Sequence, residues 1–163
     1  MIRDYSNFDV YIDDLQQDIY RQPVDDGHLE WATDSLKMVP KNVSTVLDVG
    51  CGEGFLRPLF WQRGIGWRGI TLGKQDYWKC RNRGYEEDEI HLGDFTFTDF
   101  DNESFDLIYA RHALEHSPCP IPTLMEWHRI AKKVLLLIAP APEYWTYVGK
   151  NHYSVANEEQ LGS

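Results

Sequence analysis

The chain has 163 residues, of which 42% are apolar and 13% aromatic, and its formal net charge is -10. This length and composition predict one folded domain with a sizeable core and exclude a disordered chain. The negative charge argues against a broad nucleic-acid-binding face, because the long-range field of such a protein repels phosphate.

Only a few basic residues could form a local phosphate-binding patch: Arg57, Arg63, Arg68 and the segment 79–83. Charged side chains of this kind are more often solvated surface groups than a binding face. We therefore expect no nucleic-acid partner.

Cysteine usage and the N-terminal segment bear on the compartment. The three cysteines, Cys51, Cys80 and Cys119, form no Cys-x-x-Cys pair, so neither a disulfide framework nor a Cys-rich zinc site is indicated. The N-terminus is too acidic and too poor in apolar residues for a signal peptide, and the longest apolar stretch, 134–139, is too short to span a membrane. We expect no membrane association and a cytoplasmic location.

The first predicted elements are helical. Residues 1–27 are rich in Tyr and Asp, and within them 11–20 predicts a short amphipathic helix. Residues 28–39 predict a second helix with apolar positions at core-facing spacing, which Pro40 ends.

From residue 45 onward, apolar runs alternate with helical patterns. The runs read as continuous buried strands, which is typical of a parallel sheet covered on both faces. The sequence thus predicts a doubly wound α/β fold. The expected strands are 45–50, 67–72, 89–94, 104–110 and 134–140, and the expected helices between them are 55–64, 74–84 and 121–133.

A glycine-rich turn follows the first strand, within the segment VLDVGCGEGF at 46–55. A dinucleotide site needs Gly-x-Gly-x-x-Gly and an acid about twenty residues further on. Here Phe55 stands where the third glycine should be, and the later segment GITLG at 69–73 holds no acid. Both departures argue against a nicotinamide-dependent oxidoreductase.

The carboxylates of the turn indicate a cationic ligand. Asp48 precedes the glycines and Glu53 lies among them, and both would repel a pyrophosphate. S-adenosylmethionine fits better, because it carries an ammonium and a sulfonium, while the glycines let backbone amides approach its carboxylate.

This turn is similar to the first motif of class I S-adenosylmethionine-dependent methyltransferases, and the chain resembles a methyltransferase type 11-like domain over residues 45–140. The Gly-Asp pair at 93–94 and the Phe-Asp-Leu-Ile run at 105–108 extend the resemblance. It implies that 28–163 form the S-adenosylmethionine-binding domain and that 1–27 form an N-terminal lid or substrate cap.

The resemblance also implies which residues bind the cofactor. Those expected at its methionine end are Asp48, Gly50, Cys51, Gly52 and Gly54; those expected at the ribose and adenine are Thr71, Leu72, Asp94 and Phe95; those expected beneath the sulfonium are Ala110, Arg111 and His112.

Two departures from the family pattern affect these expectations. The second strand normally ends in an acid that holds the ribose hydroxyls, whereas this chain has Thr71 there; Asp76 either supplies the missing carboxylate or is a solvated helix residue. Members also finish with a sixth and an antiparallel seventh strand, and this sequence is C-terminally short of both. Either the sequence is a fragment, or a homodimer or another partner covers the open sheet edge, which would otherwise invite pairing with another chain.

Methyl transfer needs a general base only if the acceptor must lose a proton. The candidate bases are His112 and His116, four residues apart on a predicted helical turn, and His152 and Tyr153 near the end of the chain. His112 is the preferred catalytic candidate, and His116 fits a structural role. Two histidines alone seldom bind a metal, so no metal is expected.

These observations predict an enzyme that transfers the methyl group of S-adenosylmethionine to a small-molecule acceptor. The tyrosines of 1–27 and the segment 142–147 are candidates for the substrate wall, although a single sequence does not identify the acceptor. The alternative is a methyltransferase-like binding or partner subunit that is catalytically weak or inactive.

Overall fold

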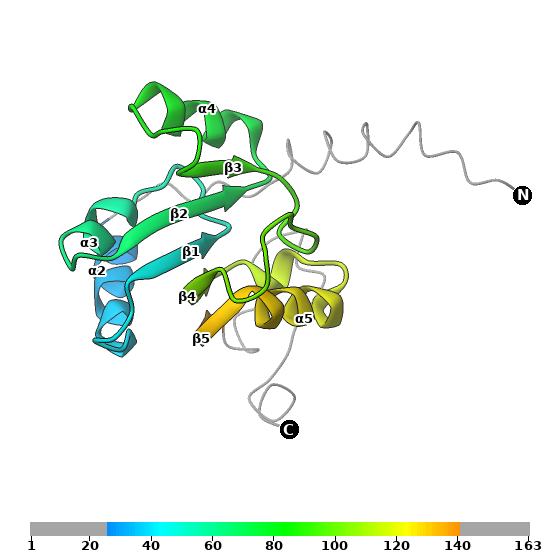
Figure 1. Cartoon of the computed structure of the whole chain (residues 1–163). Coiled ribbons are helices and arrows are strands. Elements are labelled where there is room, and N and C mark those ends of the chain that lie inside the picture. Colours follow the sequence, from blue (N-terminus) through cyan, green and yellow to red (C-terminus); the bar gives the residue numbers. More distant parts are fainter. Residues whose placement is uncertain (1–25, 141–163) are drawn as a thin grey trace, which may run out of the picture.

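The computed structural model describes residues 26–140 of the chain (Figure 1). The helix expected at 11–20, most of the expected lid, the segment 142–147, and the candidate bases His152 and Tyr153 all lie outside the described residues.

The described residues contain a five-stranded sheet in the order β3-β2-β1-β4-β5. All four strand pairs are parallel, which confirms the doubly wound α/β class. The strand order reverses between β1 and β4, and in open α/β sheets ligands bind beyond the carboxyl ends of the strands at such a point. The strands are β1 (Thr45–Val49), β2 (Gly66–Thr71), β3 (Ile90–Leu92), β4 (Phe105–Arg111) and β5 (Ala131–Ile138).

Helices cover both faces of this sheet, as Figure 1 shows. One face carries α2 (Asp26–Ser35) with the 3-10 turn η1 (Leu36–Met38), α3 (Arg57–Trp61) and α4 (Lys74–Asn82). The opposite face carries α5 (Pro120–Ile130), which packs there through Trp127 and Ile130.

Two helices differ most from the prediction. The helix expected over 55–64 is only five residues long, because Gly54 has a φ of +69° and the residues between it and Arg57 belong to the turn. The helix expected over 121–133 ends at Ile130. Ala131 already pairs with Phe105, so Lys132 and Lys133 belong to β5.

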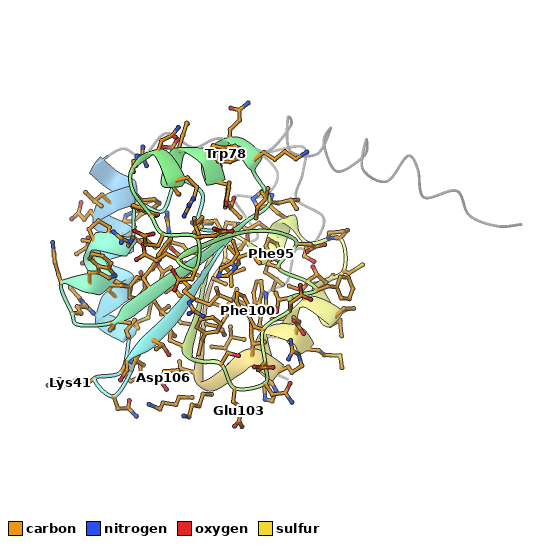
Figure 2. The ribbon with its side chains drawn as sticks, turned by 45° about the horizontal axis from the view of Figure 1, so that its top comes forward. Lys41, Trp78, Phe95, Phe100, Glu103 and Asp106 are labelled. Carbon is orange, nitrogen blue, oxygen red and sulfur yellow. The ribbon has the colours of Figure 1, made fainter. Side chains whose placement is uncertain are left out.

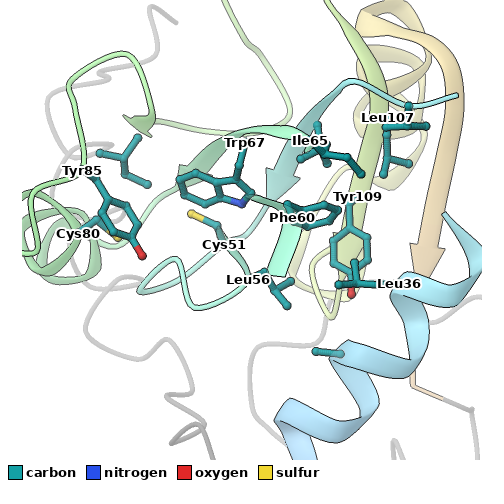
Figure 3. Packing of buried hydrophobic residues seen from close by; sticks show 14 residues of the cluster. Leu36, Cys51, Leu56, Phe60, Ile65, Trp67, Cys80, Tyr85, Leu107 and Tyr109 are labelled. Carbon is teal, nitrogen blue, oxygen red and sulfur yellow. The ribbon is translucent and has the colours of Figure 1, made fainter. Parts of the chain in front are cut away.

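The larger apolar cluster lies between the sheet and α2–α4 (Figure 3). Phe60 and Tyr109 pack edge to face with their ring centroids 5.5 Å apart, and Trp67 packs in the same way on Tyr85 at 5.7 Å. The Tyr109 hydroxyl lies 2.7 Å from the Ser35 hydroxyl, which joins α2 to β4. Aromatic pairs of this geometry add about 0.5–1.5 kcal/mol each to the burial energy.

The amino end of the sheet is held by polar contacts of Asp106. This residue lies with Lys41 and Glu103 at the end of the molecule opposite Phe95 (Figure 2). Its carboxylate accepts a hydrogen bond from the Ser44 backbone at 2.8 Å and pairs with Lys133 at 2.9 Å. These contacts fix the amino ends of β4 and β5. The glycine turn lies at the opposite end of the sheet, after β1.

Candidate functional site

The glycine turn leaves the carboxyl end of β1 with three residues in the left-handed region. Gly50, Gly52 and Gly54 have φ values of +68°, +53° and +69°. Residues other than glycine rarely adopt this backbone region, so the turn depends on its glycines. A Cβ at Gly54 would in addition lie 2.6 Å from the ring of Tyr85, which makes this glycine a close-packing position.

The backbone amides of the turn divide into two groups. Gly50 and Cys51 both donate to the carbonyl of Ile70, at 3.0 and 3.2 Å, and Gly54 donates to Cys51 at 3.0 Å. Within residues 26–140, no acceptor contacts the amides of Gly52 and Glu53. The amides that can receive a ligand are therefore those of the middle of the turn, and a Cβ at Gly52 would meet open space.

Asp48 is buried beneath this turn, with 3% of its surface exposed. Its Oδ2 accepts a hydrogen bond of 3.1 Å from Nε1 of Trp67 on the neighbouring strand. Burial raises the pKa of Asp48 to about 7, against the opposing effects of this hydrogen bond and of the Arg111 charge. The carboxyl group can thus exchange a proton near neutral pH.

Glu53 does not present a free carboxylate to a ligand, contrary to the expectation that it would attract a cation. It forms ion pairs with Lys79 and with Arg83, the latter at 2.7 Å, and both partners come from α4 or its end. These two cations lower the pKa of Glu53. The side chain therefore attaches the turn to α4.

Cys51 contributes its backbone to the turn and its side chain to the core. Its thiol is buried beside Trp67 and would lie 2.6 Å from a Cβ at Gly69 (Figure 3). Burial and the neighbouring charge of Asp48 raise its pKa well above the ordinary value. The thiol stays protonated and is not a nucleophile.

At the end of β2, Thr71 and Asp76 converge on one backbone position. The Thr71 hydroxyl accepts a hydrogen bond from the Gly73 amide at 3.2 Å. A Cβ placed on Gly73 would lie 3.0 Å from Oδ2 of Asp76 and 3.5 Å from Oγ1 of Thr71. The charge of Asp76 also raises the pKa of Cys51, so this carboxylate acts on the glycine turn. Leu72 follows at intermediate burial.

After β3, Asp94 and Phe95 begin a tight loop. Oδ1 of the exposed Asp94 accepts a hydrogen bond from the Thr96 amide at 2.7 Å, which is an Asx turn. Phe95 packs on Trp127 with ring centroids 5.7 Å apart, and its carbonyl accepts the Trp127 Nε1 hydrogen at 3.0 Å. The loop after β3 is thereby fixed to α5.

The end of β4 brings Arg111 next to the glycine turn. Ala110 is fully buried and pairs with Val49 of β1. The Arg111 guanidinium carbon lies 5.3 Å from the ring centroid of Phe55, within the range of a cation–π contact. Its Nη1 is buried and has no hydrogen-bond partner among the residues that the structure describes.

His112 and His116 do not share a helical turn, so that expectation is wrong. His112 has a φ of +52°, and the 3-10 turn η2 (Leu114–His116) begins only two residues later. Nδ1 of His112 instead lies 3.2 Å from Oε1 of Glu115. Glu115 is 2% exposed, so a buried carboxylate stands behind this histidine.

The basic residues considered for a phosphate-binding patch form ion pairs with acidic residues or donate hydrogen bonds to backbone carbonyls. Arg57 forms a bidentate pair with Glu89, Arg68 lies 3.8 Å from Asp88, and Lys79 and Arg83 pair with Glu53. The guanidinium groups of Arg63 and Arg81 donate to carbonyl oxygens of Leu36 and Tyr85. The described surface offers no unpaired basic cluster at these positions.

Two further observations concern metals and membranes. Within the described range, no three His, Cys, Asp or Glu side chains come together as metal ligands. In the same part of the chain, no helix has the length and apolar character needed to cross a bilayer.

Sequence reasoning missed two residues of this site. Trp67 was assigned only to a strand, yet its indole is the hydrogen-bond partner of Asp48. Glu115 lies between the two candidate histidines in the sequence, and its carboxylate contacts His112. Asp48 and Trp67 lie on different strands, so no local signal in the sequence predicts their contact. Glu115 lies only three residues after His112, and this short spacing is the signal that could have identified it.

Comparisons with known proteins give a consistent result. The family described as "Methyltransferase domain" matches residues 47–138, which is more than half of the chain. Two curated relatives are the ubiquinone biosynthesis O-methyltransferases of Pseudomonas paraeruginosa and Hahella chejuensis, each 33% identical, over 92 and 91 residues. These matches cover 54% and 53% of this chain but only 40% and 38% of the relatives.

Solved structures share the fold over most of the chain. A chain from the Haloferax volcanii complex that contains the Trm112 methyltransferase activator is 25% identical with a TM-score of 0.68; the match covers 93% of this chain and 70% of that one. An S-adenosylmethionine-dependent methyltransferase from Archaeoglobus fulgidus is 20% identical with a TM-score of 0.68, over 82% of this chain and 65% of that one.

Proposed function

The chain belongs to the methyltransferase domain family, and from this premise we propose that it binds S-adenosylmethionine and transfers the methyl group to a small-molecule acceptor. The observation that carries the proposal is the glycine turn at the carboxyl end of β1, with three left-handed glycines and two amides open to a ligand. S-adenosylmethionine supplies a methyl group already activated by a sulfonium.

The methionine end of the cofactor is assigned to the turn and to Asp48. The amides of Gly52 and Glu53 would hold its carboxylate, since Gly50, Cys51 and Gly54 use their amides within the protein. An ammonium beside Asp48 would favour the ionised carboxyl, which burial otherwise disfavours. The donor set therefore fits an amino acid group with both charges.

The ribose and adenine are assigned to the ends of β2 and β3. Asp76 is the acid for the ribose hydroxyls, because its carboxylate lies beside the Thr71 hydroxyl at Gly73. Thr71 and Leu72 would line this part, and Asp94 and Phe95 would contact the adenine. Oδ1 of Asp94 accepts the hydrogen bond from Thr96, and no described residue donates a hydrogen bond to its Oδ2, which leaves this oxygen for the adenine amino group.

Below the methyl group, we assign Ala110, Arg111 and His112. They end β4 at the point where the strand order reverses, directly beside the turn after β1. The family relatives named above act in O-methylation, which supports a small molecule as acceptor.

A protein partner is a further part of the proposal. The outer edge of β5 pairs with no strand within 26–140, and an unpaired edge is open to another chain. The Haloferax volcanii neighbour occurs in a complex with an activator protein. We propose either a homodimer or a second protein at this edge.

The test is methyl transfer by the full chain. Labelled S-adenosylmethionine is incubated with hydroxyl, amine and thiol compounds, and formation of S-adenosylhomocysteine is followed by mass spectrometry. We expect acceptor-dependent formation that Gly50→Val abolishes, because a branched side chain cannot adopt φ +68° there. Cofactor binding without turnover on any acceptor would instead support the alternative, a binding or partner subunit.

A further inference from the structure

The backbone at His112 is held in a conformation that non-glycine residues seldom adopt. Its φ is +52°, and only Glu103 shares a positive φ among the described non-glycine residues. The His112 amide donates to the carbonyl of Ile138 at 2.9 Å, so β5 holds the strained residue in place. Such strain costs about 1–3 kcal/mol and is found mainly where it sets a functional side chain.

The side chain that this backbone directs meets a buried acid. Oε1 of Glu115 lies 3.2 Å from Nδ1 of His112, and the Glu115 side chain is 1% exposed. Oε2 of Glu115 has no hydrogen-bond partner in the described part of the chain. A buried carboxylate needs a hydrogen-bond donor. The His112 ring is the side chain that the structure places within hydrogen-bond distance of the Glu115 carboxylate.

The other ring nitrogen faces away from this contact. The His112 side chain is 33% exposed, and no described residue forms a hydrogen bond with its Nε2. The ring is therefore oriented by an acid at one nitrogen and available to a ligand at the other. This is the arrangement in which a general base is both aimed and strengthened.

We propose that Glu115 is a positioning residue that keeps a proton on Nδ1 of His112, so that Nε2 removes the proton of a hydroxyl acceptor. The inference rests on the proposed methyl transfer and narrows its acceptor to a compound methylated on oxygen. A neutral hydroxyl is a poor nucleophile and gains from losing its proton, whereas an ionised thiol needs no base.

The transfer balances with these residues. The hydroxyl proton passes to Nε2 of His112 while the acceptor oxygen bonds to the methyl carbon, and the electron pair of the breaking carbon–sulfur bond stays on sulfur. His112 becomes an imidazolium that the Glu115 carboxylate stabilises, and it later releases the proton to water. The adjacent Arg111 carries a second positive charge at the end of β4.

The first test reads the tautomer of His112 by nitrogen NMR on the full chain above neutral pH. We expect the proton on Nδ1 in the wild type, although free histidine prefers it on Nε2. Glu115→Met should return the proton to Nε2, and Glu115→Gln should keep it on Nδ1, because the amide oxygen still accepts. His116 provides the internal control, since Glu115 substitutions should leave its tautomer unchanged.

The second test asks whether the site ionises a hydroxyl. The protein is loaded with S-adenosylhomocysteine and titrated with 4-nitrophenol in mildly acidic buffer, where the free phenol is colourless and its anion is yellow. We expect a yellow bound form in the wild type that is lost in His112→Asn and reduced in Glu115→Gln, which retains the hydrogen bond but not the charge. His116→Asn should keep the colour.

The outcomes separate this inference from the proposed function. Nε2 protonation in the wild type, or no yellow form at saturating 4-nitrophenol, overturns the role of Glu115 and His112 even if S-adenosylhomocysteine binds. Failure of S-adenosylhomocysteine to bind overturns the proposed function, and the tautomer result then still decides whether Glu115 positions the ring. Circular dichroism of each variant establishes that it is folded, and Glu115→Gln preserves the shape if Glu115→Met does not.

Discussion

The indole of Trp67 donates a hydrogen bond to the carboxyl group of Asp48 across 3.1 Å, and this contact joins β2 to β1 beneath the glycine turn. Both residues are almost fully buried. A carboxyl group with a single neutral donor cannot offset the cost of burial, so its pKa rises to about 7. The proposed cofactor site therefore contains an acid that titrates in the physiological range.

Removal of this donor should raise the pKa of Asp48 further. Trp67→Phe keeps an aromatic ring but has no N–H, so the ionised carboxylate loses its hydrogen bond. Carbon NMR of the labelled Asp48 side chain would measure the change, and Trp78→Phe, at an exposed position of α4, is the matched control. An unchanged or lower pKa in Trp67→Phe would show that the hydrogen bond does not stabilise the charge.

Asp48 should also make stability fall as the pH rises. Its ordinary pKa is 3.8 and its folded pKa is about 7. Between these values the unfolded chain has lost the proton and the folded chain still holds it, so each pH unit favours unfolding, by about 4 kcal/mol over the whole window. Asp48→Asn removes this effect, and urea unfolding should show the variant gaining stability relative to the wild type from acidic to neutral pH.

Glu126 provides the opposite sign as a control for that experiment. The Arg129 partner and hydrogen bonds from Thr98 lower the pKa of Glu126 to about 2. Its stabilising contribution is present above the ordinary pKa of 4.5 and is lost as the pH falls toward 2. Glu126→Gln should therefore lose stability relative to the wild type at neutral pH and approach it in acid. The same trend for both variants would contradict the assignment of Asp48.

The glycines of the turn should differ in their sensitivity to alanine. Gly52→Ala introduces strain at φ +53° but meets open space, which predicts a loss of about 1–2 kcal/mol. Gly54→Ala adds a clash, because its Cβ would lie 2.6 Å from the Tyr85 ring, and we expect a total of about 2–5 kcal/mol. Thermal and urea unfolding would compare the two. Equal losses would mean that Tyr85 moves away at little cost.

The Glu53 side chain should contribute weakly to stability through its surface ion pairs and should not contribute to ligand binding. Its ion pairs with Lys79 and Arg83 involve partly exposed groups, so Glu53→Gln should cost less than about 1 kcal/mol, and less still in high salt. S-adenosylhomocysteine affinity should change by no more than about twofold, which corresponds to roughly 0.4 kcal/mol. A tenfold loss of affinity would place this carboxylate at the ligand after all.

The fold follows from the sequence because its strands are continuous apolar runs separated by glycine or proline. Val46, Leu47 and Val49 illustrate this, since residues on both faces of β1 are buried. The boundary between α5 and β5 could not be predicted from the sequence, because Lys132 and Lys133 favour a helix locally. The pairing of Ala131 with Phe105 places both lysines in the sheet. Long-range register of this kind overrides local propensity.

The candidate site was predictable where the residue type itself determines the backbone conformation. The positive φ of Gly50, Gly52 and Gly54 could be expected without knowing which distant residues pack around them, and all three have it. The partners of charged groups were not predictable, because Glu53 finds its cations on α4 and Asp48 finds its donor on β2. The sequence shows which acids surround the turn, and only the packing shows which of them are already neutralised.

The central claim is that the glycine turn of this chain binds S-adenosylmethionine, and isothermal titration calorimetry tests it most directly. The full chain is titrated with S-adenosylmethionine, S-adenosylhomocysteine and NAD, alongside Asp76→Asn, with Asp88→Asn as the control on a surface acid paired with Arg68. We predict binding of both sulfur ligands but not of NAD, with about tenfold weaker affinity in Asp76→Asn, as expected for the loss of roughly 1.4 kcal/mol, and none lost in Asp88→Asn. Binding of NAD alone, or no binding of either sulfur ligand, would contradict the account.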